Sequence, residues 1–169
     1  EGLTRVDDKL LQLTWQNGFG YAYDLELNQL ETFRFKESKE GWGLAYNGEH
    51  LYKTDGTDKI WVLDAKDYSE QYYIEAVTDE IRLKSLNELD FIDGKLYANT
   101  YQKESIVIIN PQNGAVEGLI SLKGLKENIG NKRTADVLNG VAYKASTEEL
   151  FVTGKNWDKL FVIEIIPVE

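Results

Sequence analysis

A short two-strand pattern returns four times along this chain of 169 residues, and these repeats constrain the fold more than any other feature. The copies begin at residues 1, 42, 87 and 139, with first segments such as WGLA (42–45) and NGVA (139–142). A period of roughly 40–50 residues with several short strands in each unit is typical of a β-propeller. We therefore predict an all-β propeller in which about four blades are visible.

The segments between the repeat starts support the same fold. Apolar runs such as IWVL (60–63) and IVII (106–109) have the composition of buried strands. The pairs Asn47-Gly48 and Asp93-Gly94 are typical of tight turns between antiparallel strands. The last copy has only three clear strands, and a longer polar stretch over 123–137 precedes it, either a plain loop or a lid beside a site. We expect residues 1–169 to form a single β-propeller domain.

The composition argues against several classes of protein. The chain has no cysteine and one histidine, so it can form neither a disulfide framework nor a histidine-rich zinc site. A formal net charge of −10 argues against a nucleic-acid groove, which needs a basic surface. No apolar stretch is long enough to cross a membrane. We therefore expect neither a nucleic-acid partner nor a membrane partner.

The repeat also predicts which side chains meet. In a propeller the innermost strands line a central channel, and the start of the first strand lies beside the end of the antiparallel second strand. These two positions are 14 residues apart in the first three copies and 16 apart in the fourth. We expect them to form a rim at one opening of the channel: Glu1, Trp15, Trp42, Asn87, Tyr101, Asn139 and Lys155. Glu40, Glu88 and Trp157 are next to these positions in the sequence.

Nine segments, in order over nearly the whole chain, resemble the plant- and bacterial-type glutaminyl cyclases, also called glutamine cyclotransferases. They include EGWGL (40–44), LNELD (86–90), YANTY (97–101) and FVTGKNW (151–157). That family is a five-bladed β-propeller. The resemblance implies a further blade before residue 1, which carries a Thr-Gln-Gly motif and supplies a closing strand. We therefore expect this domain to lack its first blade.

The resemblance implies a glutaminyl-peptide cyclotransferase, an acyltransferase of the aminoacyltransferase type. Such an enzyme converts the N-terminal glutamine of peptides or proteins to pyroglutamate and releases ammonia. By analogy Glu1, Asn87 and Lys155 are catalytic, with Glu1 as the acid/base carboxylate, and Trp15, Trp42 and Tyr101 bind the substrate. Tyr101 stands where the family often has tryptophan. No cofactor and no metal are implied, and we expect a secreted or periplasmic location.

The residue types suit this chemistry. Closing a five-membered ring is intramolecular, so much of the catalysis can come from positioning by flat aromatic walls. An amide N–H or an ammonium, such as those of Asn87 and Lys155, can stabilise the oxyanion of the tetrahedral intermediate. A carboxylate can take the proton of the attacking amine and pass it to the leaving nitrogen, a role that fits Glu1.

Two other classes of function stay open from the sequence. Propeller lactonases and related hydrolases hold calcium with Glu, Asn and Asp oxygens around the channel, and Glu1, Asn87 and Asn139 could supply such ligands. Against this, Trp42 occupies an equivalent position and no aspartate completes the set. The second alternative is a non-catalytic propeller that serves as a binding module, because a fold alone does not prove activity.

Overall fold

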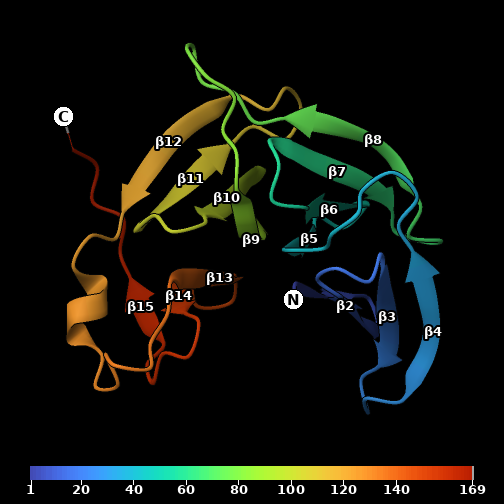
Figure 1. The fold of residues 1–169 in the computed structure, drawn as a ribbon, viewed down its shortest axis with the longest axis horizontal. Coiled ribbons are helices and arrows are strands. Elements are labelled where there is room, and N and C mark those ends of the chain that lie inside the picture. The colour runs from blue at the N-terminus through green and yellow to red at the C-terminus, as the bar shows by residue number, and fades with distance from the viewer. Residues whose placement is uncertain (169) are drawn as a thin grey trace.

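The computed structural model describes residues 1–168 and contains four antiparallel sheets arranged around a common centre (Figure 1). The first sheet consists of β1 (Leu3–Val6), β2 (Lys9–Leu13), β3 (Phe19–Asp24) and β4 (Gln29–Arg34). The second consists of β5 (Leu44–Tyr46), β6 (His50–Thr54), β7 (Lys59–Asp64) and β8 (Glu70–Glu75). The third consists of β9 (Leu86–Ile92), β10 (Lys95–Thr100), β11 (Ser105–Ile109) and β12 (Val116–Ser121). The fourth consists of β13 (Leu138–Lys144), β14 (Glu149–Gly154) and β15 (Phe161–Ile163).

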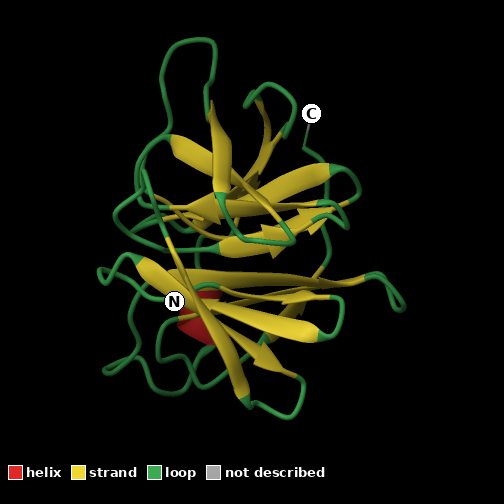
Figure 2. Cartoon of the chain, turned by 90° about the vertical axis from the view of Figure 1, so that its right-hand side faces the viewer, coloured by secondary structure: helices red, strands yellow, loops and turns green. Residues whose placement is uncertain are grey.

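Each sheet is a blade in which strands that are consecutive in the sequence are hydrogen-bonded neighbours. The first strand of each blade lies innermost, and β1, β5, β9 and β13 contact one another in that order. One short 3-10 helix, η1 (Leu125–Asn128), interrupts a chain that otherwise consists of strands and loops within the described residues (Figure 2). The predicted all-β propeller with about four visible blades is confirmed, and the fourth blade has three strands in residues 1–168.

The turn residues form the turns that the sequence predicts. Asp93 and Gly94 both have positive φ, 47° and 81°, in the two-residue connection between β9 and β10. This backbone twist matches the twist of the flanking strands and is the reason that Asp-Gly favours such hairpins. Gly48 has a φ of 96° in the corresponding turn of the second blade.

The hydrophobic core lies between neighbouring blades. Three clusters of buried side chains join the first blade to the second, the second to the third and the third to the fourth. Leu51, Leu96 and Leu150 occupy the same repeat position in three second strands and are all buried. Burying a leucine side chain stabilises a fold by roughly 1.5–3 kcal/mol. The recurring leucine therefore contributes to the attraction between blades in each cluster.

The first two inner strands approach their neighbours closely because glycine directly precedes each of them. The Gly2 N–H donates to the Trp42 carbonyl at 2.7 Å, and a Cβ on Gly2 would lie 2.7 Å from the Gly43 backbone. A Cβ on Gly43 would lie 2.4 Å from the Asn87 carbonyl oxygen. The third blade has Glu88 at this repeat position, where the other three blades have glycine.

No helix among the described residues is long and apolar enough to span a bilayer.

Candidate active site

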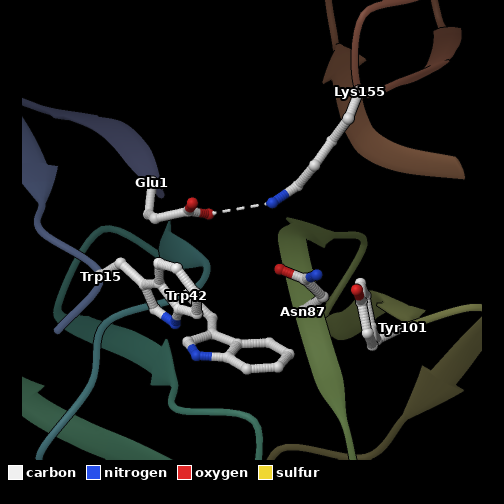
Figure 3. Close-up of a pocket in the computed structure, with 6 residues that line it drawn as sticks. All are labelled: Glu1, Trp15, Trp42, Asn87, Tyr101 and Lys155. Atoms are coloured by element: carbon white, nitrogen blue, oxygen red, sulfur yellow. Dashed lines mark hydrogen bonds and ion pairs between the residues drawn. The ribbon is translucent and has the colours of Figure 1, made fainter. Parts of the chain in front are cut away.

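One pocket of about 160 Å³ gathers side chains from all four blades (Figure 3). Each lies at the end of an inner or second strand, at the positions where the repeat predicts a rim. The residues that line it are Glu1, Trp15, Trp42, Asn87, Tyr101 and Lys155. The structure thus brings together all six side chains to which the sequence assigned a role.

The charged groups of the pocket come from opposite ends of the chain. Lys155 follows β14 in the fourth blade and extends toward Glu1, which precedes β1 in the first blade (Figure 3). The distance between the Lys155 Nζ and the Glu1 Oε2 is 3.5 Å, and the two side chains are 37% and 27% exposed. An ion pair this accessible contributes at most about 1 kcal/mol to stability. The pair therefore matters more for the charge of the pocket than for the fold.

Asn87 supplies a neutral polar group from β9 to the wall of the pocket. The residue is only 2% exposed, and its Oδ1 has no hydrogen-bond partner among the described residues. Its backbone carbonyl accepts a hydrogen bond from the Thr54 hydroxyl at 2.8 Å. The Thr54 Oγ1 in turn accepts a hydrogen bond from the Gly43 N–H. A buried polar atom without a partner costs roughly 1–3 kcal/mol. A ligand that donates a hydrogen bond to the Asn87 Oδ1 would recover that energy.

Aromatic rings form the apolar walls. Trp42 meets Tyr101 edge to face, with ring centroids 5.8 Å apart and planes at 77°. Gly56 lies under the Trp42 ring with a φ of 80°, and a Cβ at this position would be 2.6 Å from the ring. Gly56 is the repeat equivalent of Trp15 and Tyr101. The second blade therefore has no side chain at this position, and the Trp42 ring occupies the space.

Glu88 is a second carboxylate beside the pocket, although it is not among the residues that line it. Burial raises its pKa to about 7, and the nearby Glu1 charge acts in the same direction. Hydrogen bonds from the backbone N–H groups of Leu89 and Leu44 and the charge of the chain terminus act in the opposite direction. The cost of desolvating the charged form is the largest of these effects.

The polar stretch over 123–137 holds the turn that carries Lys155. The Lys155 N–H donates to the Val137 carbonyl at 2.9 Å, and the Asp136 N–H donates to the Lys155 carbonyl at 2.9 Å. The Trp157 Nε1 donates to the Asp136 carbonyl at 2.9 Å. None of the residues that line the pocket comes from 123–137. The stretch therefore holds the Lys155 turn without lining the pocket, and of the two alternatives, a plain loop and a lid, the structure favours the plain loop.

The comparison with known proteins follows the same residues. The family model for glutamine cyclotransferases matches residues 1–165. The chain belongs to the glutamine cyclotransferase family. Glutaminyl-peptide cyclotransferase of Arabidopsis thaliana is 35% identical over 170 residues, which cover 98% of this chain and 52% of the relative. The chain thus spans about half the length of this curated relative.

Solved structures agree with this assignment to the glutamine cyclotransferase family. The crystal structure of Myxococcus xanthus glutaminyl cyclase has a TM-score of 0.88 and 28% identity, over 97% of this chain and 71% of that chain. The WD40 β-propeller domain of Doa1 has a TM-score of 0.57 at 13% identity, over 92% of this chain and 46% of that chain. This second likeness shows the propeller fold alone.

Within this glutamine cyclotransferase fold, two residues that the repeat placed at or near the rim have other roles. Asn139 was expected on the rim, but it does not line the pocket, and its Oδ1 accepts a hydrogen bond from the Glu88 N–H at 3.2 Å. Trp157 packs its indole on Gly154 and also lies outside the set that lines the pocket. Asn139 joins the third and fourth blades, because an amide at the start of an inner strand can bond to the neighbouring backbone.

The donor set bears on the calcium-dependent alternative. Among residues 1–168, no group of three or more His, Asp or Glu side chains lies close enough together to hold a metal ion. The site instead contains one carboxylate, one ammonium and one amide between aromatic walls. Of the three ligands that the calcium-dependent alternative uses, Asn139 does not line the pocket, and its Oδ1 is bonded to the Glu88 N–H.

Proposed function

We propose that the protein is a glutaminyl-peptide cyclotransferase that converts the N-terminal glutamine of peptides or proteins to pyroglutamate and releases ammonia. The observation that carries the proposal is the pocket itself. In a member of the glutamine cyclotransferase family, six residues at family-like sequence positions line one cavity, and a carboxylate and an ammonium face each other within it. The roles of the individual residues are part of the proposal.

The size of the pocket suits one amino-acid residue. Its volume of about 160 Å³ is well below the roughly 300–1,000 Å³ of clefts that enclose drug-sized ligands. We propose that the glutamine side chain folds back between the rings of Trp15, Trp42 and Tyr101, so that its amide carbon approaches its own α-amine. The rest of the peptide leaves through the mouth of the pocket. Holding two reacting groups together in this way removes much of the entropy cost of the reaction.

The reaction needs one bond to form and one to break. Glu1 accepts a proton from the substrate ammonium, and the neutral amine attacks the side-chain amide carbon, forming the ring C–N bond. The carbonyl oxygen becomes an oxyanion, which the Lys155 ammonium or the Asn87 N–H stabilises. Glu1 then gives the proton to the amide nitrogen, the old C–N bond breaks as the carbonyl reforms, and ammonia leaves. The Glu1 carboxylate takes the second proton from the ring nitrogen, which leaves the neutral lactam, and passes this proton to the departing ammonia to give ammonium.

The unpaired oxygen of Asn87 fits the same arrangement. The substrate enters with N–H groups on both its amine and its amide, and either group can donate to the Asn87 Oδ1. The hydrogen bond would remove the cost of leaving this buried atom without a partner. Asn87 would therefore orient the substrate through its oxygen while its N–H₂ group stays available for the oxyanion.

A synthetic peptide with N-terminal glutamine tests the proposal. We expect time-dependent release of ammonia and a product that lacks one ammonia by mass spectrometry. The same peptide with an acetylated N-terminus has no nucleophilic amine, and a peptide with glutamine only at the second position cannot form this ring, so both should stay unchanged. If the Gln-initiated peptide binds but is never cyclised, the protein is a binding module. Hydrolysis of a lactone that requires calcium would instead support the hydrolase.

We also propose a secreted or periplasmic location and catalysis without a metal ion. The location rests on the resemblance of the sequence to its family, and the absence of a metal rests on the donor set of the pocket. Fractionation of the native host, followed by detection with an antibody, tests the location. Recovery of the protein only in the cytoplasmic fraction would contradict it.

A further inference from the structure

Glu40 links two walls of the pocket without lining it. Its Oε2 accepts a hydrogen bond from the Trp15 Nε1 at 2.8 Å and another from the Trp42 Nε1 at 2.7 Å. Trp15 belongs to the first blade and Trp42 to the second, and Glu40 lies in the connection between β4 and β5 that joins these blades. One carboxylate oxygen thus sets the direction of two indole rings that face the same cavity.

The other two tryptophans, Trp61 and Trp157, do not share a hydrogen-bond acceptor. The Trp61 Nε1 donates to the Asp55 Oδ2 at 2.8 Å, and the Trp157 Nε1 donates to a backbone carbonyl at 2.9 Å. Only the two tryptophans that line the pocket share an acceptor. The shared acceptor therefore distinguishes the pocket from the rest of the aromatic side chains.

A buried ion pair fixes the connection that carries Glu40. The Glu70 carboxylate accepts hydrogen bonds from three consecutive backbone N–H groups, at residues 36, 37 and 38, and from the Ser38 hydroxyl. The Lys53 Nζ lies 3.3 Å from the Glu70 Oε1 and donates to the Glu40 carbonyl at 3.1 Å. The side chains of Lys53 and Glu70 are 0% and 1% exposed.

The charge state of Glu70 supports this anchoring role. Although burial acts to raise the pKa of Glu70, its hydrogen bonds with Ser38 and the backbone and the charge of Lys53 outweigh burial, and the pKa lies below its usual value. Glu70 therefore remains an ionised acceptor for the N–H groups of the connection. Charged acceptors form stronger hydrogen bonds than neutral ones. Glu70 and Lys53 therefore hold the backbone of the connection that leads to Glu40 in place.

We propose that Glu40 is a positioning residue that fixes the Trp15 and Trp42 rings at the separation and angle needed to hold an N-terminal glutamine. The inference rests on the proposed function and adds a residue to it. Trp15 is 51% exposed, so without Glu40 little else would restrain its indole. Ordering a side chain on binding weakens affinity, and fixing two rings beforehand avoids that loss.

The test uses three variants of the protein. Glu40→Leu keeps a side chain of similar size but removes the carboxylate that accepts hydrogen bonds from both indoles. Glu40→Gln keeps one neutral acceptor oxygen. Glu37→Leu is the matched control, because Glu37 lies in the same connection and only its backbone N–H takes part in the anchoring described above. We expect the KM for a Gln-initiated peptide to rise roughly tenfold in Glu40→Leu, with kcat within about twofold. Glu40→Gln should show a smaller rise, and Glu37→Leu none.

A second readout does not depend on activity. The four indole N–H signals in a ¹H–¹⁵N NMR spectrum can be assigned with single Trp→Phe variants. In Glu40→Leu, the signals of Trp15 and Trp42 should shift and exchange faster with water, while those of Trp61 and Trp157 stay unchanged. If Glu40→Leu does not fold, the smaller shift of the same two signals in Glu40→Gln tests the same contacts.

The outcomes separate the two proposals. Unmoved Trp15 and Trp42 signals, or moved signals with an unchanged KM, would overturn the positioning role while cyclisation by the wild type stands. An equal rise of KM in Glu37→Leu would also overturn it, because the effect would then belong to the connection as a whole. A wild type that never cyclises the peptide would overturn the proposed function, and the positioning role with it.

Discussion

Glu1 and Glu88 are carboxylates close enough for the charge of Glu1 to act on Glu88, yet their surroundings differ. Glu1 faces the pocket, and its carboxylate lies 3.5 Å from the Lys155 ammonium. Glu88 is desolvated, with a pKa of about 7, and no cationic side chain within residues 1–168 forms an ion pair with it. Glu1 thus has a charged partner, whereas Glu88 is desolvated, so two identical side chains have different electrostatic environments.

This difference indicates how the two groups divide their work. A carboxylate must touch the substrate to move its proton, and of the two only Glu1 lines the pocket that we propose for the substrate. Glu88 does not line the pocket, and we expect its charge to affect the stability of the inner strands more than the chemistry. The predictions below compare the two groups directly, beginning with the largest expected effect.

Glu1→Gln should have the largest effect. The substitution keeps the shape of the side chain and its hydrogen bonding but removes the group that accepts the proton. We expect kcat for a Gln-initiated peptide to fall by roughly 10²–10⁴-fold, with a much smaller change in KM. Steady-state ammonia release measures both constants. A variant with near-normal kcat would remove Glu1 from the mechanism.

Glu88→Gln should change the pH dependence of stability. The folded protein binds the Glu88 proton more tightly than the unfolded chain does, since the pKa is about 7 in the fold against a usual value of 4.5. The contribution of Glu88 to stability is therefore fully present below about pH 4.5 and is lost as the pH rises through about 7. At about 1.4 kcal/mol for each pKa unit, the loss is at most about 3 kcal/mol.

Urea unfolding of the wild type and of Glu88→Gln at pH 4.5 and pH 8 measures this loss. The free energy of unfolding of the wild type should fall more between the two pH values than that of the variant. Other groups titrate in both proteins, so the difference between them isolates Glu88. Parallel pH profiles would contradict the raised pKa.

Lys155→Met tests the partner of Glu1. The pair is partly exposed, so we expect the free energy of unfolding to change by less than about 1 kcal/mol. The loss of the ammonium should still lower kcat, by roughly ten- to a hundredfold, because hydrogen bonds to charged groups are worth about 1.5–3 kcal/mol. Thermal melting and turnover of the same sample separate the two effects. Lys159→Met, with the Lys159 Nζ bonded to the Asn128 carbonyl away from the pocket, is a control that should keep kcat.

Chelation should have the smallest effect of all. Prolonged dialysis against EDTA should leave kcat unchanged if Glu1 and Glu88 act as separate carboxylates. Loss of turnover with the fold intact, followed by recovery on adding calcium, would show that turnover needs calcium and would support Glu1 as a calcium ligand in place of the proton-transfer group that contrasts with Glu88. That result would remove the contrast between them.

The repeat predicts much of the fold and the membership of the pocket. A period of roughly 40–50 residues specifies blades, and equivalent positions in neighbouring blades must then converge, as Tyr101 and Lys155 do. Glu88 also leaves a signal in the sequence, because it replaces the glycine found in the other three copies. Its burial could not be read from the sequence, since it depends on how closely the inner strands pack.

Other features depend on side-chain directions that a repeat does not contain. The position of Glu40 beside the rim is visible in the sequence, but its two hydrogen bonds depend on how the rings of Trp15 and Trp42 turn. Asn139 has the correct repeat position for the rim, yet its amide bonds to the Glu88 backbone. The stretch over 123–137 could not be distinguished from a lid, because its packing on the Lys155 turn involves backbone groups that every residue has.

The most direct measurement compares Glu1→Gln with Glu88→Gln in one assay. Both variants neutralise a carboxylate at almost constant shape, and both are followed by ammonia release from the same Gln-initiated peptide at pH 8. The account predicts that Glu1→Gln loses at least about a hundredfold in kcat, while Glu88→Gln stays within a few-fold of the wild type. Equal losses in the two variants, or a larger loss in Glu88→Gln, would contradict the assignment of proton transfer to Glu1.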